Sequence, residues 1–407
     1  MPDMPTLAHT FRDAGYQTTA VGKLHVYPQR DRIGFHEVIL SEEGRIEFGL
    51  VDDYESYLKE SGYEGEYFTH GMGNNEYVTR PWHLPEEHHV TNWATREMAR
   101  TIQRRDPTRP SLWYLSYVHP HPPLVPLGCY LDMYREMPID LPVSGEWAFD
   151  PEALPHALRK SRDHGERMSL YQTRAVRRAF YAMCTHIDHQ LRVVIGTLRE
   201  QGQLDNTIIL FTSDHGDMLG KHGLWAKQVY FEEAARVPMI LLGRSGDERV
   251  GFDCVDDRLV GLQDVMPTLL DLAGLERPDS VRGRSMVSGD QREFLFCEYG
   301  EGARASRMVR EGSYKLIYYP VGNRTQLFDL AGDPEELVDL SESADHAAEK
   351  ERLEQRMIHE FHGSDVDLVK DGILVGAPDL AYEPQPNRGL STQRGGHWRP
   401  PKVRPQG

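Results

Sequence analysis

A carboxylate and an imidazole follow a hydrophobic segment near the middle of the sequence. Residues 207–211 (TIILF) are apolar and β-branched, and Asp214 and His215 come shortly after them. Ligands of open α/β sheets bind at the carboxyl ends of the strands, so we expect a buried strand that delivers both groups to such an edge. The pair suits a divalent cation. A loop in which both groups only satisfy local hydrogen bonds is the alternative.

Basic side chains occupy similar positions elsewhere in the sequence. Lys23 and His25 follow one short apolar segment, His121 lies in the loop HPHPP after another, and Lys227 follows the Asp-His pair. Fixed donors stabilise the charge of an anionic tetrahedral centre, and a histidine can protonate a departing oxygen. These residue types favour hydrolysis of a sulfate or phosphate ester over acyl transfer. Neither a GxSxG nor a GxxxxGK[ST] motif is present.

Each of these side chains also has a structural explanation. A lysine after a glycine is commonly solvated, and the histidines of the HPHPP loop can be ordinary loop residues. Other His and Asp residues lie in a predicted helix or in loop-like sequence, and we interpret them as structural. They are His186, Asp188 and His189 in the helix, and the pairs His88–His89 and Asp52–Asp53 in loops.

Helices and strands alternate through the first two thirds of the chain. Apolar spacing and flanking residues predict helices at 4–14, 171–201 and 264–273, and strands at 18–21, 111–118, 207–211 and 237–242. This alternation favours an α/β fold with a mostly parallel central sheet flanked by helices. The loops after three of these strands carry the polar residues described above, and we expect them to converge on one edge.

The pattern changes after about residue 290. Short strands with turn signals are predicted at 294–299, 305–310, 314–319 and 326–330, which indicates a small antiparallel subdomain. A helix at about 343–361 follows. We therefore divide the chain into a core at 1–288, the subdomain at 289–345, and a helix with a Pro-, Gly- and Arg-rich tail at 346–407. A peripheral tail and a binding arm are both compatible with the composition of that last segment.

Composition limits the classes of partner. The 407 residues carry a formal charge of −17, which argues against a general nucleic-acid binder. No apolar run approaches the ~20 residues of a membrane span, and the start of the sequence has no signal-peptide core. The four cysteines form no CxxC pair, so free thiols are expected. The sequence does not predict an oligomeric state.

Several segments together resemble the sulfatase family of the alkaline-phosphatase superfamily. The segment MPTLAHTFRDAGYQTTAVGKLH is similar to the family's P-T-L-A and G-K-x-H region, and LDNTIILFTSDHGDMLGKHGLWAK is similar to its metal-binding segment. The loop HPHPPLVP and the later segments DVMPTLLDLAG and QLFDLAGDPEE support the resemblance. It covers about residues 4–345 and implies the alkaline-phosphatase-like fold.

The resemblance also implies roles for single residues. Asp214 and His215 match one pair of metal ligands, and Lys23 and His25 match the pair that contacts the sulfate and the nucleophile. His121 matches the histidine near the leaving-group oxygen, and Lys227 matches a second lysine on the sulfate. His119 and Lys221 are the weaker candidates for these last two roles. The implied cofactor is a divalent metal, with Ca²⁺ favoured over Mg²⁺ or Mn²⁺, and the implied substrate is a small-molecule or glycan sulfate ester.

Two elements of the family pattern are absent. The nucleophile is a cysteine in Cys-x-Pro/Ala-x-Arg that is oxidised to formylglycine, and none of the four cysteines here lies in that motif. The first pair of metal-binding aspartates is absent too. Both elements normally precede the P-T-L-A helix, so a truncated gene model or fragment is one account and a genuine pseudoenzyme is the other. As written, the chain is expected to bind metal weakly and to show little or no hydrolysis of an ester.

Three functions follow from these residues. The first is a sulfuric ester hydrolase, in which the lysines neutralise the sulfate and His121 assists the leaving group. The second is a phosphonate monoester or phosphodiester hydrolase, which would use the same centre. The third is a non-catalytic sulfatase-like protein that binds an anionic glycan or a partner.

Overall fold

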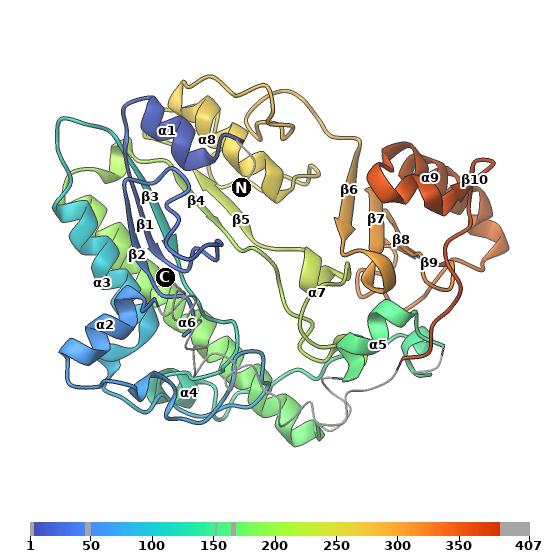
Figure 1. Cartoon of the computed structure of the whole chain (residues 1–407), viewed down its shortest axis with the longest axis horizontal. Coiled ribbons are helices and arrows are strands. Elements are labelled where there is room, and N and C mark those ends of the chain that lie inside the picture. Colours follow the sequence, from blue (N-terminus) through green and yellow to red (C-terminus); the bar gives the residue numbers. More distant parts are fainter. Residues whose placement is uncertain (1–3, 45–49, 151–152, 164–167, 383–407) are drawn as a thin grey trace, which may run out of the picture.

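The structure is a computed structural model, and it describes residues 4–44, 50–150, 153–163 and 168–382 (Figure 1). The predicted tail at 384–407 lies outside this range. Helices and strands alternate up to α8, after which an antiparallel sheet follows. The helices are α1 (Leu7–Asp13), α2 (Asp53–Glu60), α3 (Val90–Gln103), α4 (Gly128–Met133), α5 (His156–Asp163), α6 (Leu170–Glu200), α7 (Glu232–Ala235), α8 (Val265–Ala273) and α9 (Ala347–Glu360).

A parallel three-stranded sheet lies at the centre of the first part of the chain. Its central strand is β1 (Gln17–Gly22), which pairs with β2 (Glu37–Leu40) on one side and β3 (Ser111–Ser116) on the other. The fold class expected from the alternation of elements is confirmed, and so are the strands at 18–21 and 111–118. The strand β2 was not anticipated from the sequence.

Neighbouring residues of β1 pack into different hydrophobic clusters, because successive strand residues point to opposite faces of a sheet. Ala20 packs with Ala8 of α1 and with Val38 and Leu40 of β2. Val21 belongs to the larger cluster, which includes Trp93 of α3. Helices therefore cover the strand on both sides.

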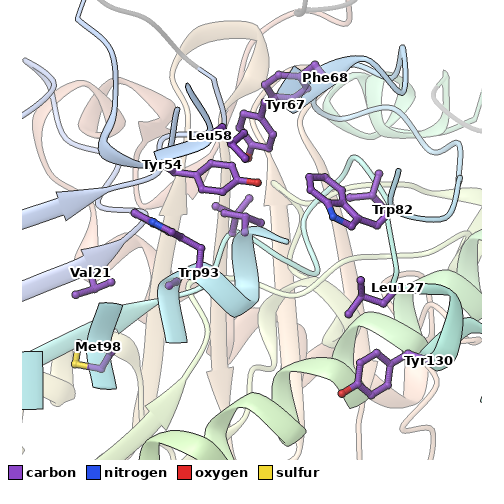
Figure 2. Close-up of a cluster of buried hydrophobic side chains, with 14 of the residues drawn as sticks. Val21, Tyr54, Leu58, Tyr67, Phe68, Trp82, Trp93, Met98, Leu127 and Tyr130 are labelled. Carbon is purple, nitrogen blue, oxygen red and sulfur yellow. The ribbon is translucent and has the colours of Figure 1, made fainter. Parts of the chain in front are cut away.

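The larger cluster is rich in aromatic side chains and fixes α2 against α3 (Figure 2). The Tyr54 ring lies 4.8 Å from that of Tyr67 and 5.2 Å from that of Trp93, between ring centroids. The hydroxyl of Tyr54 donates to the backbone oxygen of His88 at 2.7 Å, so its polar end is satisfied inside the core. This contact ties α2 to the segment that leads into α3.

The long helix α6 is the predicted helix at 171–201. Ser169 accepts from the backbone of Gln172, and the Gln172 side chain reaches back to the cap, forming a capping box. Buried Val176, Ala179 and Met183 recur at three- and four-residue spacing, as an apolar helix face requires. The helix packs against α3 and α4 and supports the central layer from one side.

The strands β4 (Ile209–Thr212) and β5 (Met239–Leu242) form a separate antiparallel pair. Both strands lie where they were predicted, but the expectation that the strand at 207–211 is buried was wrong. All four residues of β4 are half-buried, and Tyr114 of β3 and Ile240 of β5 are 40% and 52% exposed. Among the described strands, β3 pairs with β1 alone and β4 with β5 alone, so their side chains lack the neighbours that bury an inner strand.

The predicted antiparallel subdomain is present as a sheet in the order β6-β7-β8-β9. Leu353 and Met357 of α9 pack on Val309, Leu316 and Leu327 of this sheet. A two-stranded hairpin of β10 and β11 closes the described part of the chain. The strands are β6 (Phe294–Tyr299), β7 (Ser306–Glu311), β8 (Tyr314–Tyr319), β9 (Arg324–Asp329), β10 (Val369–Lys370) and β11 (Ile373–Leu374).

The four cysteines are free thiols, as expected. Three of them are exposed and Cys297 is half-buried. Within the described ranges, none of the helices combines the length and the apolar character that crossing a bilayer requires.

Candidate functional site

The loops after β1, β2, β3 and β4 bring charged side chains together. Lys23 follows β1 directly because Gly22 ends that strand with a φ of +101°, and an added Cβ would lie 1.8 Å from the backbone oxygen of Ser116. The backbone N–H of Lys23 then donates to the same oxygen at 3.1 Å. The Gly-Lys pair is thus explained by the close approach of β1 to β3.

A buried carboxylate joins the first and third loops. Oε1 of Glu43 lies 3.1 Å from Nζ of Lys23 and 3.3 Å from Nδ1 of His121. The side chain of Glu43 is 1% exposed, and those of Lys23 and His121 are 14% and 9% exposed. The predicted convergence of Lys23 and His121 is therefore found, and a glutamate that was not predicted lies between them.

Lys227 completes this group from the segment that follows β4. Its Nζ lies 2.6 Å from Nε2 of His121 and donates to Oδ1 of Asn75 at 3.2 Å. Nδ1 of His121 lies 2.8 Å from the backbone oxygen of Pro122. With an acceptor at Nδ1 and an ammonium at Nε2, the imidazole is neutral and carries its hydrogen on Nδ1.

Burial determines the ionisation of both partners. Burial, together with the charges of Lys227 and Lys23, lowers the pKa of His121 to about 3, although Glu43 acts in the opposite direction. Burial also lowers the pKa of Lys227, assisted by Lys23 and opposed by Asp217 and Glu43. A neutral imidazole next to an ammonium with a lowered pKa is a pair suited to proton transfer.

The charge of Asp217 also acts on Lys227 and raises its pKa. Asp217 was not singled out in the sequence. The hydroxyl of Tyr77 donates to its Oδ2 at 2.5 Å, and the backbone N–H of Leu219 donates to its Oδ1 at 3.0 Å. Burial raises the pKa of Asp217, and these hydrogen bonds oppose the rise.

His25 lies next to a second glutamate of the same loop. Oε1 of Glu42 accepts from the backbone N–H groups of Leu24 and His25 at 2.8 and 2.9 Å, which fixes His25 in a left-handed conformation with φ of 54°. Nδ1 of His25 lies 3.9 Å from Oε2 of Glu42. Burial of Glu42 favours its neutral form, but the hydrogen bonds from His25 and Leu24 prevail and lower its pKa. Glu42 thus shapes the loop that carries Lys23 and His25.

Asp214 and His215 lie at the end of β4, as expected. Gly216 allows this turn to pass α7 closely, because an added Cβ would lie 1.9 Å from the backbone oxygen of Glu233. The ring of His215 lies 6.2 Å from that of His121 between centroids, so the pair borders the lysine–histidine group. Nδ1 of His215 lies 2.7 Å from the backbone oxygen of Gly216, and the Asp214 side chain is 74% exposed.

A metal needs more ligands than this pair supplies. Among the described residues, no group of three or more His, Cys, Asp or Glu side chains is arranged to hold an ion. Asp214 and His215 have the right chemistry but provide two ligands at most, where Ca²⁺ takes six to eight and Mg²⁺ six. The described residues therefore do not fit a complete metal site.

The weaker candidates, Lys221 and His119, make contacts other than those that join Lys23, Glu43, His121 and Lys227. Lys221 is buried and pairs with Glu233 and with Glu335 at 2.7 Å, so its charge is used within the fold. His119 is 5% exposed, and its Nδ1 lies 3.3 Å from the backbone oxygen of His121. It supports the loop rather than facing the lysines.

Three of the residues interpreted as structural make structural contacts in the fold. Nε2 of His186 lies 2.5 Å from Oδ1 of Asn92, and its ring stacks on Tyr130 at 4.7 Å. His89 caps α3, and Asp52 caps α2. Burial raises the pKa of Asp52 to about 7 and lowers that of His186 to about 3.

Glu42 and Glu43 are the principal residues of the group that the sequence did not identify. They follow the short apolar run Val38–Leu40, so the strand-end rule that identified Lys23 and Asp214 also applies to them. The signal was weak because β2 is only four residues long. Asn75 and Tyr77 lie in irregular structure and had no such signal.

Comparison with known proteins identifies the family. The family model for sulfatases matches residues 1–275, and the model for the C-terminal part of N-sulphoglucosamine sulphohydrolase matches residues 220–362. The chain is 33% identical over 396 residues to an arylsulfatase of Clostridium perfringens, covering 92% of this chain and 81% of that protein. It is also 33% identical over 359 residues to a choline-sulfatase of Rhizobium meliloti, covering 84% and 68%.

A solved structure agrees on the fold. A phosphonate monoester hydrolase of Agrobacterium radiobacter superposes with a TM-score of 0.75 at 21% identity, covering 88% of this chain and 80% of that one. The resemblance inferred from the Gly-Lys-x-His and Asp-His-Gly segments is confirmed. Because the family model spans residues 1–275 and the relatives match most of the chain, the protein belongs to the sulfatase family.

Proposed function

We propose that the chain is a sulfuric ester hydrolase whose substrate oxyanion binds between Lys23, His121 and Lys227. The observation that carries the proposal is the 2.6 Å contact between Nζ of Lys227 and Nε2 of His121, within a group that also contains Lys23. Two ammonium groups suit the charge of a sulfate ester. The relatives named above are sulfatases, which supports this class of substrate, either a small molecule or a glycan.

In this proposal the residues of the chain bind the oxyanion and handle one proton. The lysines neutralise the negative oxygens of the head group. A water oxygen bonds to the sulfur as the ester bond to the leaving oxygen breaks. The leaving oxygen takes the electron pair of that bond and a proton from the His121–Lys227 pair, and a proton of the attacking water restores the pair. His25, whose backbone N–H donates to Glu42, lies in the same loop as Lys23.

Asp214 and His215 are proposed to contribute to a divalent metal site together with ligands beyond those described. Sulfatases generally use such a metal, and we favour Ca²⁺ over Mg²⁺ or Mn²⁺. The carboxylate and the imidazole are suitable donors, and the exposed position of Asp214 leaves it accessible.

A second candidate is hydrolysis of a phosphonate monoester. The fold of a phosphonate monoester hydrolase superposes over 88% of this chain, and a phosphonate monoester presents the same tetrahedral, singly charged head group. A third candidate is binding without turnover, because the Cys-x-Pro/Ala-x-Arg motif is absent from the 407 residues.

One experiment separates the three candidates. The full chain, its Lys227→Met variant and a Lys59→Met control are assayed for binding and turnover of 4-nitrophenyl sulfate and of a phenyl phosphonate monoester. Lys59 is exposed on α2 and pairs with Glu64, so its replacement leaves the site intact. Faster turnover of the sulfate, lost in Lys227→Met only, supports the proposal.

The other outcomes are equally informative. Faster turnover of the phosphonate supports the second candidate. Binding that depends on Lys227 but gives no turnover supports the third. If neither ester binds, or if Lys227→Met binds both esters as the unaltered chain does, the proposed site is wrong.

A further inference from the structure

Glu43 places a negative charge among the residues that are proposed to bind an anion. Its carboxylate lies 3.1 Å from the ammonium of Lys23 and 3.3 Å from Nδ1 of His121. Its charge also acts on Lys227. A carboxylate at this position weakens the attraction of the two lysines for every anion, so its presence calls for an explanation.

Shaping the loop does not explain it. The neighbouring Glu42 accepts the backbone N–H groups of Leu24 and His25 and so performs that task. Oε1 of Glu43 instead contacts the side chains that are proposed to bind the substrate. Glu43 therefore acts on the charge around Lys23 and His121.

The effect of one fixed negative charge depends on the charge of the ligand. A sulfate monoester carries one negative charge, whereas a phosphate monoester carries close to two above about pH 7. Repulsion by a carboxylate at a few ångströms is proportional to the ligand's charge, so it penalises the doubly charged head group about twice as strongly.

We propose that Glu43 is a specificity-determining residue that selects singly charged tetrahedral head groups over doubly charged ones. The inference rests on the proposed function, because it requires that the oxyanion binds next to Lys23 and His121. It extends that function by naming the class of ester that the pocket excludes, namely phosphate monoesters. Removing the charge while keeping the shape of the side chain is expected to relax this selection.

The test uses two ligands of nearly identical shape, benzenesulfonate and phenylphosphonate. At about pH 8.5 the first carries one negative charge and the second carries two. Their Kd values are measured by calorimetry for the full chain, for Glu43→Gln and for Glu37→Gln. Glu37 is exposed on β2, so the last variant controls for the loss of one negative charge from the protein.

The unaltered chain is expected to bind benzenesulfonate at least as tightly as phenylphosphonate. In Glu43→Gln the ratio of the two Kd values is expected to shift toward phenylphosphonate by about tenfold or more, with no shift in Glu37→Gln. Glu43→Asp keeps the charge and is expected to keep the preference.

Three results overturn the inference. One is a change of both Kd values by the same factor in Glu43→Gln, which leaves the proposed function intact. Another is seen without any variant: the unaltered chain binds phenylphosphonate with a Kd at least tenfold lower than that of benzenesulfonate. If neither ligand binds the unaltered chain, the proposed oxyanion site is wrong, and this inference falls with it.

Discussion

The amine of Lys227 lies 2.6 Å from Nε2 of His121, although 106 residues separate the two in the sequence. The contact joins the loop after β3 to the segment after β4. Together with burial, it keeps the imidazole of His121 neutral. In the proposed reaction, the pair supplies the proton that the departing alcohol takes up.

Replacing Lys227 by Met is expected to raise the pKa of His121 above its value of about 3. Burial is the main cause of the low pKa and remains in the variant, so the pKa should stay below the ordinary 6.5. The ammonium of Lys227 is the cause that is removed. The measurement is an NMR titration of the His121 ring in both proteins. An unchanged or lower pKa would contradict the geometry described above.

Asp214→Ala is expected to lose most of the activity while the fold is retained. The side chain is 74% exposed, so its removal should change the free energy of unfolding by about 0.5 kcal/mol or less. Turnover of 4-nitrophenyl sulfate and urea unfolding are measured on the same preparation. Asp205→Ala, at another exposed aspartate before β4, is the matched control. Turnover near that of the unaltered chain would show that Asp214 is not part of the site.

Buried histidines are expected to make the protein unstable in acid. Burial lowers the pKa of His186 to about 3 and that of His119 to about 4, whereas an unfolded chain has histidines near 6.5. Between these values the unfolded chain binds more protons, so stability is complete above about pH 6.5 and is lost as the pH falls. Each such histidine contributes a slope of up to about 1.4 kcal/mol per pH unit.

The contribution of one histidine can be isolated. In His186→Gln the free energy of unfolding should vary less steeply between about pH 6 and 4 than in the unaltered chain. His359→Gln, at an exposed position of α9, should leave the slope unchanged. Equal slopes in all three proteins would mean that His186 titrates normally in the folded state.

Lys315→Met is expected to destabilise the fold by about 3–5 kcal/mol. Nζ of Lys315 lies 2.7 Å from Oε1 of Glu232 and 2.6 Å from Oε1 of Glu336, and the lysine is 1% exposed. Its loss leaves two carboxylates without their shared cation at the junction of α7 and β8. Urea unfolding measures the change, with Lys59→Met as an exposed control. A loss below about 1 kcal/mol would show that water reaches the carboxylates.

Much of the fold could be predicted from local patterns. The capping residues and apolar spacing of 171–201 predicted α6 because a helix depends on contacts within a few turns. The strands β6 to β9 were predicted from short apolar runs with turns between them. Burial of β4 was not predicted correctly, because burial depends on which strands and helices lie alongside, and a run such as TIILF does not encode its neighbours.

The sequence by itself determined the chemistry available to this protein. The Gly-Lys-x-His and Asp-His-Gly segments defined the family and placed Lys23, Asp214 and His215 at strand ends, since each segment follows a short apolar run that forms a strand. Only the tertiary structure decided how these groups are combined. Glu43 lies between Lys23 and His121 because β2 runs parallel to β1, and pairing between segments that are apart in the sequence is decided only in the tertiary structure.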